Sequence, residues 1–300
     1  MADTRPHSAI TIGTFDGIHL GHRALLQRTR EIAKGHELKS LAVTFPRPPQ
    51  NYLGRPKQLL MPSEKRIALL AQYVDQVVVI EFPEIQWLSP REFVTGILCE
   101  RLRAAAVVVG RNFRFGRSRK GNVSTLVELG SELGLDVQIV DPVLVNGEQV
   151  SSTAIRKAIQ LGDIEQATRL LGDPPQLWGK VIRGEGQGRA LGFPTANLSV
   201  DPELLMPGEG IYAARVFYRN ESRAGSLYIG RRPTFNGTRT SVEVHILEAD
   251  SDKELYGEEL AVQLFTRLRG EKRFASAEEL QAQIRTDVEA TREFFSRKSF

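Results

Sequence analysis

Cysteine is almost absent from this sequence, and long apolar runs are missing altogether. Cys99 is the single cysteine among 300 residues, so the chain cannot build a disulfide framework, which indicates either a reducing compartment or a buried thiol. No apolar run reaches the ~20 residues that span a bilayer. The opening residues also lack the basic-then-apolar layout of an export signal. We therefore expect a cytoplasmic protein with no membrane partner.

The sequence also lacks a strong charge of one sign. Lys and Arg number 40 against 36 Asp and Glu, which leaves a net charge of +4. The basic residues are scattered except in Arg111–Lys120. Such a balance is more typical of a protein with anionic small ligands than of a nucleic-acid binder. We expect no nucleic-acid partner, and the sequence predicts no particular oligomeric state.

The length and composition favour two globular domains. Three hundred residues correspond to two domains at ~150 residues each, and 41% hydrophobic with 25% charged residues is ordinary for folded domains. Asp173–Gln176, which reads Asp-Pro-Pro-Gln, breaks the helical pattern and marks a boundary. The predicted domains are residues 1–173 and 178–300.

The first domain alternates apolar runs with helix-period stretches. Continuous runs such as Ala106–Val109 indicate strands covered on both faces, as in a parallel sheet with crossover helices. The predicted strands are Ala9–Phe15, Ser40–Phe45, Gln76–Phe82, Ala104–Gly110 and Asp136–Val140. The predicted helices are Leu20–Lys34, Ser63–Gln72, Ser89–Arg103, Val123–Leu133, Ser152–Gln160 and Asp163–Leu171. The fold class of this half is therefore α/β.

The second domain has strands without alternating long helices, which favours an antiparallel sheet or a small barrel. The predicted strands are Trp178–Arg183, Gly210–Tyr218, Ser241–Leu247 and Leu260–Leu268. A final helix begins at Ser276, where Ser-Ala-Glu-Glu forms a capping-box pattern. Leu280, Ile284 and Val288 share one face of that helix, which we expect to pack on the barrel.

A glycine-rich run, Gly13–His22, follows the first predicted strand and opens the first helix. Ligands bind beyond the carboxyl ends of parallel strands, and a helix N-terminus offers free N–H groups to phosphates. Gly13 lets the backbone approach a nucleotide, and we expect Phe15 to contact the nucleotide as well. His19 and His22 are spaced to face the same phosphates. The alternatives are a satisfied histidine pair or a metal site, but no cysteine or third histidine lies nearby to complete a zinc set.

A second glycine-rich stretch, Gly179–Asn197, matches neither common nucleotide fingerprint. Arg189 stands where a dinucleotide-binding loop has its third glycine, and there is no phosphate-binding G-x-x-x-x-G-K-[ST] pattern. The stretch ends in a turn that holds Thr195 and Asn197. Hydroxyl and amide oxygens are hard ligands suited to a Mg²⁺ ion that also touches ATP phosphates, although an ordinary turn is the alternative.

The run Gly13–His22 resembles the Gly-x-Phe-Asp-Gly-x-His-x-Gly-His motif of the nucleotidylyltransferase superfamily, whose domain is Rossmann-like. Ser151–Arg156 resembles that superfamily's later Ser-Ser-Thr-x-Ile-Arg motif. The resemblance implies in-line attack on the ATP α-phosphate, with Ser152, Thr153 and Arg156 binding phosphate as well. Read alone, Ser151–Thr153 is a helix N-cap.

Val109–Gly116 resembles the flavin-enzyme version of this domain. The resemblance implies that Asn112 contacts the nucleotide and that Phe113 or Phe115 lies against a flavin ring; core aromatics are the alternative. Thr44–Pro49 departs from the Thr-Phe-Asp-Pro-His-Pro that the family often has, although Phe45 remains as an apolar residue for the flavin. This departure motivates the alternative of a first domain that binds nucleotide without turnover.

Gly188–Asn197 resembles the riboflavin kinase motif, and Gly230–Phe235 and the Glu-Val-His at 243–245 match the same family in order. The resemblance implies a six-stranded antiparallel barrel in which Gly188 contacts nucleotide, Thr195 and Asn197 bind Mg²⁺, and Glu243 is the general base. Read alone, Glu243 is a solvated strand carboxylate.

The order of the motifs is that of the bacterial bifunctional riboflavin kinase/FAD synthetase family. That family implies synthesis of FMN from riboflavin and ATP, followed by synthesis of FAD and pyrophosphate from FMN and a second ATP. Besides the kinase with an inactive first domain, a regulatory flavin- or RNA-binding module without catalysis remains, motivated by Arg111–Lys120.

Overall fold

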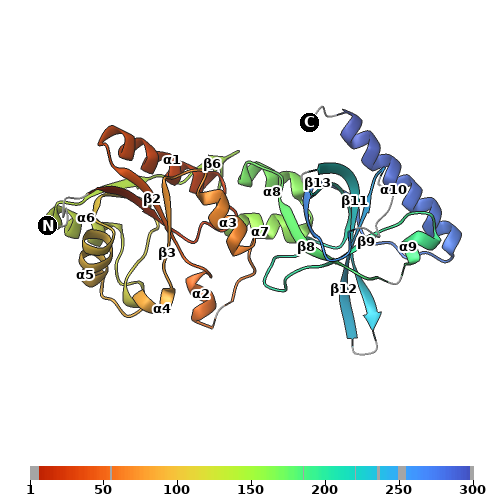
Figure 1. Cartoon of the computed structure of the whole chain (residues 1–300), viewed down its shortest axis with the longest axis horizontal. Coiled ribbons are helices and arrows are strands. Elements are labelled where there is room, and N and C mark those ends of the chain that lie inside the picture. The colour runs from red at the N-terminus through yellow and green to blue at the C-terminus, as the bar shows by residue number, and fades with distance from the viewer. Residues whose placement is uncertain are drawn as a thin grey trace. The chain divides into compact units, whose positions relative to one another are not determined.

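The structure, a computed structural model, describes residues 7–54, 56–184, 186–219, 221–234, 237–248 and 255–297. Phe235 of the Gly230–Phe235 motif lies outside these residues. The chain forms two compact units (Figure 1). Unit 1 comprises Met1–Lys57 and Pro62–Ser151, and unit 2 comprises Gln58–Met61 and Ser152–Phe300. The domain boundary that the sequence places between residues 173 and 178 stays a prediction.

Unit 1 is built on a parallel sheet of five strands in the order β3-β2-β1-β4-β5. The strands are β1 (Ser8–Ile12), β2 (Lys39–Thr44), β3 (Gln76–Val79), β4 (Ala104–Gly110) and β5 (Asp136–Val140). All five predicted strands are confirmed. Strand β1 ends earlier than expected because the chain turns away after Gly13, and Phe15 adopts a φ of 52°, which is incompatible with a strand.

The helices of unit 1 are α1 (Leu20–Gly35), α2 (Pro49–Tyr52), α3 (Ser63–Leu70), α4 (Phe82–Ile85), α5 (Pro90–Glu92), a π-helix (Phe93–Arg101), a 3₁₀ turn (Arg117–Arg119) and α6 (Val123–Leu133). A short hairpin pairs β6 (Leu144–Val145) with β7 (Glu148–Gln149). The helix expected over Ser89–Arg103 is therefore divided between α5 and the π-helix. The turns of the π-helix are wider than those of an α-helix: at its end the Leu102 N–H donates to the Ile97 carbonyl, five residues back instead of four.

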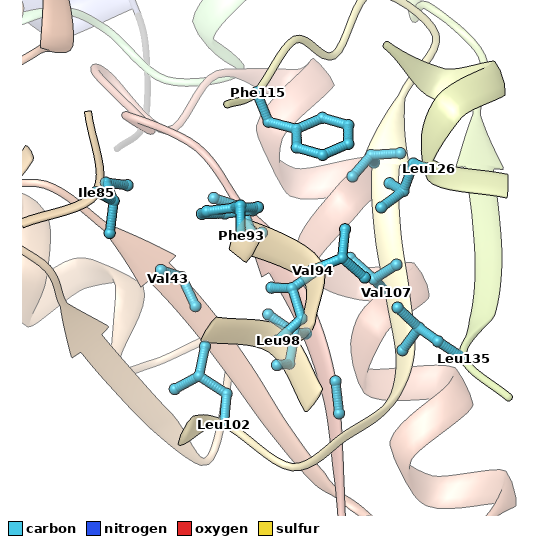
Figure 2. Packing of buried hydrophobic residues seen from close by; sticks show 14 of the residues in the cluster. Val43, Ile85, Phe93, Val94, Leu98, Leu102, Val107, Phe115, Leu126 and Leu135 are labelled. Carbon is cyan, nitrogen blue, oxygen red and sulfur yellow. The ribbon is translucent and has the colours of Figure 1, made fainter. Parts of the chain in front are cut away.

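Both faces of the central strands β2, β1 and β4 are buried, as the Val-rich run in β4 predicts. Side chains alternate along a strand, so Val107 joins one apolar cluster while Ala106 and Val108 join another on the opposite face. In the larger cluster Phe93, Val94 and Leu98 of the π-helix pack against the sheet (Figure 2).

One polar contact ties the start of β2 to the loop before β3. The Ser40 hydroxyl and N–H donate to the same Asp75 carboxylate oxygen at 2.6 and 2.9 Å, and these bonds lower the pKa of Asp75. A carboxylate with a depressed folded-state pKa stabilises the fold above its unfolded pKa of about 3.9, and that stabilisation is lost as the pH falls further.

We therefore expect Ser40→Ala to speed hydrogen exchange in β2 and β3 at pH 7. The difference from the unmodified chain should shrink as the pH falls below about 4. The matched control is Ser131→Ala at an exposed serine of α6, which should change nothing. An effect of Ser40→Ala that is equally large at pH 3 and pH 7 would contradict the role of the Asp75 charge.

Unit 2 holds a closed antiparallel barrel in the order β10-β11-β12-β9-β8-β13. Its strands are β8 (Gln176–Ile182), β9 (Ala196–Ser199), β10 (Gly210–Tyr218), β11 (Glu221–Thr234), β12 (Gly237–Ile246) and β13 (Glu259–Arg269). Its helices are α7 (Ser152–Leu161), α8 (Ile164–Leu171), α9 (Gln187–Ala190) and α10 (Ala277–Arg297). The six strands implied by the resemblance are confirmed, although the sequence pattern alone indicated four of them, without β9 and β11.

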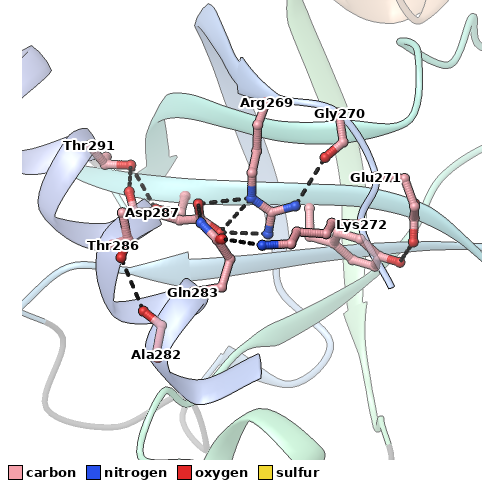
Figure 3. Close-up of polar contacts among 11 residues, drawn as sticks. Arg269, Gly270, Glu271, Lys272, Ala282, Gln283, Thr286, Asp287 and Thr291 are labelled. Carbon is pink, nitrogen blue, oxygen red and sulfur yellow. Dashed lines mark hydrogen bonds and ion pairs between the residues drawn. The ribbon is translucent and has the colours of Figure 1, made fainter. Parts of the chain in front are cut away.

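Helix α10 is fixed to the barrel by polar contacts that lie largely out of solvent (Figure 3). Arg269 at the end of β13 donates to both Asp287 oxygens at 2.8–3.2 Å. Asp287 is only 6% exposed, so the pair is charge-assisted and sheltered. One turn further on, the Thr291 hydroxyl lies 2.7 Å from that of Ser226 on β11. These contacts fix which face of α10 meets the barrel.

Candidate active sites

The loop between β1 and α1 has an unusual backbone. Phe15 and Ile18 adopt positive φ values of 52° and 41°, and Gly17 lies between them at 83°. Positive φ is costly for residues other than glycine, especially for a β-branched one, and such strain gathers at functional sites. The loop therefore holds a specific conformation where β1 meets the N-terminus of α1.

His19 and His22 come together in this loop. His19 is the N-cap of α1, and its Nδ1 accepts a hydrogen bond from the His22 N–H at 3.3 Å. The two rings stack with centroids 3.6 Å apart, and the Phe15 ring meets His22 edge-on at 5.2 Å. A side chain at Gly21 would put a Cβ 3.3 Å from the His19 ring, so glycine leaves room for that imidazole. Two imidazoles and a helix N-terminus thus lie together, an arrangement that suits phosphate.

The aromatic residues predicted to contact flavin differ in their exposure. Phe45 and Phe115 are 8% and 6% exposed and belong to the core cluster. Phe113 is half-buried and stacks on Phe115 at 5.5 Å, while Asn112 beside it is exposed. Of the three rings, Phe113 therefore has the most surface for a ligand. Flavin contact by these residues stays a prediction.

The late motif opens α7 at Ser152, as predicted. Arg156 is half-buried, and its Nε donates to the Gln58 carbonyl at 2.8 Å within unit 2. Ser152, Thr153 and Arg156 belong to unit 2, whereas His19 and His22 belong to unit 1. That these residues share one phosphate site stays a prediction.

In unit 2 the barrel places the predicted metal-binding turn against the predicted general base. Strand β9 pairs with β12 so that Asn197 lies opposite Glu243. The Thr195 hydroxyl donates to one Glu243 carboxylate oxygen at 3.2 Å, and the Ser241 hydroxyl donates to the other at 2.9 Å. Glu243 is 8% exposed, so it is no solvated surface carboxylate. Ser241 was not anticipated from the sequence, although its i, i+2 spacing puts it on the same face.

A cavity of about 310 Å³ opens beside Glu243. Its apolar wall comes from the end of the glycine-rich stretch, from β10 and from α10: Leu191, Phe193, Ile211, Leu280, Ile284 and Val288. Its polar lining includes Thr195, Glu243, His245, Ser226, Tyr228 and the Arg269–Asp287 pair, and Glu271, Lys272 and Phe274 line it from the loop after β13. This volume is at the lower end of ligand pockets, which are mostly apolar with a few placed polar groups.

Sequence comparison agrees with this division of sites. Residues 2–154 match the FAD synthetase family, and residues 171–295 match the riboflavin kinase family. The chain is 37% identical over 291 residues to the bifunctional riboflavin kinase/FMN adenylyltransferase of Escherichia coli (strain K12), which covers 95% of this chain and 92% of that protein. The chain belongs to the bifunctional riboflavin kinase/FMN adenylyltransferase family.

Another curated protein and a solved structure match this chain at a similar level of sequence identity. The Listeria monocytogenes protein of the same name is 34% identical, covering 97% of this chain and 93% of its own. A crystal structure from Streptococcus pneumoniae, described as a macrolide-efflux protein, has a TM-score of 0.87 at 30% identity and covers 96% and 94% of the two chains.

In the part of this chain that the structure describes, no helix has the length and apolarity to cross a membrane.

The family's use of ATP raises the question of a metal ion in the kinase unit. Thr195 and Asn197 offer a hydroxyl and an amide oxygen, both neutral, beside the buried Glu243. Within the described ranges no group of three or more His, Cys, Asp or Glu side chains could hold a metal. Mg²⁺ is usually bound by few protein oxygens together with substrate phosphates and water. The donor set therefore fits a Mg²⁺ ion that arrives with ATP.

The glycine-rich stretch packs closely on these same side chains. A Cβ at Gly188 would lie 2.5 Å from the Phe193 carbonyl and 3.1 Å from the Thr195 hydroxyl. A Cβ at Gly184 would overlap the Asn197 amide. Both glycines are thus required by the approach of backbone to the predicted metal ligands.

We expect Gly184→Ala to displace Asn197 and to lower the rate of FMN formation about 10²-fold, because small misplacements of reacting groups cost that much. FAD formation from supplied FMN should not change. The control is Gly35→Ala at the end of α1, whose Cβ would meet nothing within 4 Å and whose φ is not positive; it tests an unstrained glycine replacement away from Asn197. A full kinase rate in Gly184→Ala would show that Asn197 is not needed where it lies.

Proposed function

We propose that this chain makes FMN from riboflavin and ATP in unit 2, and FAD and pyrophosphate from FMN and a second ATP in unit 1. The observation that carries the proposal is the cavity in unit 2, which combines an apolar wall with polar groups that include Glu243 and Thr195. A flat aromatic ring with a polyhydroxyl tail suits such a cavity. The strained histidine loop of unit 1 and the names of the relatives support the second activity.

In the kinase unit, the apolar wall holds the flavin ring and the polar groups beside Glu243 receive the ribityl tail. Glu243 takes the proton of the ribityl 5′-hydroxyl as that oxygen attacks the ATP γ-phosphorus, and ADP leaves. The hydroxyls of Thr195 and Ser241 hold the two carboxylate oxygens in place. Bound Mg²⁺, with Thr195 and Asn197 as ligands, would neutralise charge on the phosphate oxygens.

In the adenylyltransferase unit, a phosphate oxygen of FMN attacks the ATP α-phosphorus in line, and pyrophosphate leaves. No covalent bond to the protein is needed, so the work is positioning and charge stabilisation. His19, His22 and the first N–H groups of α1 bind the phosphates as charge moves onto the leaving group. Ser152, Thr153 and Arg156 are proposed to add further phosphate contacts.

The decisive experiment is chromatography of the products formed over time from riboflavin and ATP with Mg²⁺. We expect FMN to appear first and FAD to follow, and FMN supplied alone with ATP to give FAD. FMN that accumulates without FAD would favour the kinase with an inactive first domain. Unchanged riboflavin would reject both readings.

We also propose a cytoplasmic location and no nucleic-acid partner. Cys99 is free and half-buried, and burial raises the pKa of its thiol, as suits a structural cysteine in a reducing compartment. In the basic stretch, Arg111 forms an ion pair with Asp141 through an Nε–Oδ1 bond of 2.8 Å. Salt-dependent RNA binding without ATP consumption would instead favour the non-catalytic module.

A further inference from the structure

Arg66 is a fully buried cation in unit 1. Its exposed fraction is 0%, although it lies on the short helix α3 in the polar sequence Ser-Glu-Lys-Arg. Its Nη2 donates to the carbonyl oxygens of Phe45 and Pro46, the latter at 3.1 Å, and to the Ser63 hydroxyl at 2.8 Å. Arg66 thus ties α3 to the loop that follows β2.

That loop has few hydrogen-bond donors of its own. It reads Phe-Pro-Arg-Pro-Pro over residues 45–49, and proline has no N–H. Its carbonyls must therefore find donors elsewhere, because buried backbone acceptors are nearly always paired. Arg66 provides them, and the Ser63 hydroxyl donates to the Pro46 carbonyl as well. A proline-rich loop thus depends on α3 for its conformation.

The Arg66 guanidinium interacts electrostatically with the histidine loop. Burial lowers the pKa of Arg66, while the charge of the Asp16 carboxylate raises it. Asp16 is 2% exposed and lies three residues before His19. The Thr44 hydroxyl donates to the Thr14 carbonyl at 3.3 Å, a second link between the loops after β1 and β2.

Two nitrogens of Arg66 have unused N–H donors. Among the residues that the structure describes, its Nε and Nη1 have no hydrogen-bond partner. An unsatisfied buried donor is destabilising, and more so when it is charged, so burial of this cation destabilises the fold. A methionine of similar length would fill the same space without that cost, which argues that the site keeps the cation for its effect on the two loops.

We propose that Arg66 is a positioning residue for FMN in adenylyl transfer. It holds the Phe45–Pro46 loop in the conformation that receives the flavin nucleotide, and it places a fixed positive charge beneath the loops at the carboxyl ends of β1 and β2. This inference rests on the proposed FMN adenylylation. Arg66 itself, being buried, touches no substrate.

The test is steady-state kinetics of both activities in Arg66→Met. We expect the KM for FMN in FAD formation to rise about tenfold or more, because loop displacements near 1 Å carry costs of this size. The KM for ATP in the same reaction should change little. Riboflavin phosphorylation should keep its rate, which reports that unit 2 is intact, and an unchanged circular dichroism spectrum should report that unit 1 is folded.

Arg66→Lys should restore most of the FMN affinity, because lysine keeps the charge and brings three donors to the same carbonyls. Arg66→Gln keeps a donor without the charge and should remain impaired. Lys34→Met, at an exposed position on α1, is the matched control for exchanging a cation for methionine. If Arg66→Met does not fold, Ser63→Ala removes part of the same contacts and should raise the KM for FMN alone, by a smaller factor.

Three results would overturn the inference: an unchanged KM for FMN in Arg66→Met, a change confined to the KM for ATP, or equal loss in Arg66→Lys and Arg66→Met. The unmodified chain separates this inference from the proposed function. If it makes no FAD from FMN, the proposed adenylyl transfer fails; if it does and Arg66→Met matches it, only the role of Arg66 fails.

Discussion

In Glu243→Gln, FMN formation from riboflavin is expected to fall about 10²–10⁴-fold, the usual contribution of a general base. Glutamine has the size of glutamate; its amide oxygen can accept from one of the two hydroxyls of Thr195 and Ser241, and its NH2 group can donate to the oxygen of the other, so the cavity beside it should keep its shape. What it cannot do is take the proton of the attacking hydroxyl. The measurement is the initial rate of FMN formation with saturating riboflavin and ATP with Mg²⁺.

The same Glu243→Gln chain should convert supplied FMN to FAD at the unmodified rate, because Glu243 lies in unit 2 within the barrel. Glu165→Gln, at an exposed position on α8, is the control for the loss of one negative charge in that unit. A Glu243→Gln chain that still forms FMN within a factor of about ten would assign the general base elsewhere, since such a residue is worth more than that.

His22→Ala is expected to show the opposite pattern. FAD formation from FMN should fall about 10²–10³-fold, the cost of removing one preorganised group that stabilises the transition state. The change also removes the ring on which His19 stacks at 3.6 Å, so His19 loses its support as well. Riboflavin phosphorylation should continue, so FMN should accumulate.

Two further variants test whether the loss in His22→Ala comes from the missing imidazole. His22→Asn keeps a donor near the same position and should recover part of the rate if the imidazole acts by hydrogen bonding. His36→Ala, at the other end of α1, is the control for loss of a histidine from that helix. If His22→Ala or Glu243→Gln removed both activities while the chain stayed folded, the assignment of separate sites would be wrong.

Much of unit 1 follows from its sequence, because a strand buried on both faces has a strong apolar pattern. Strand β4 is of this kind and begins and ends where the pattern predicts; the partly exposed edge strand β5 and helix α6 also do so. In the barrel the apolar pattern of the strands is weaker. Strand β9 has four residues after a proline turn, and β11 contains two glycines and a proline among polar residues. Their strand conformation comes from pairing with neighbours distant in sequence, which local propensity does not report.

The sites divide in the same way. Motif order predicts Thr195, Asn197 and Glu243 as site residues, and strand spacing places Ser241 on the same face as Glu243, but the hydrogen bond between them is seen only in the structure. The apolar spacing of Leu280, Ile284 and Val288 predicts a buried face of α10, yet not that this face lines a cavity. Arg66 is the hardest case, because a charged residue on a short helix is normally solvated. Only the shortage of donors in the proline-rich loop explains its burial.

Because α10 supplies one wall of the cavity, the two activities depend unequally on the end of the chain. A chain cut by a protease just before Ser276 keeps all six barrel strands and the whole of unit 1. It loses the wall formed by Leu280, Ile284 and Val288 and the Asp287 partner of Arg269. Proteolysis from the C-terminal end is therefore expected to abolish riboflavin phosphorylation before FMN adenylylation. The shortened protein would then use FMN without producing it.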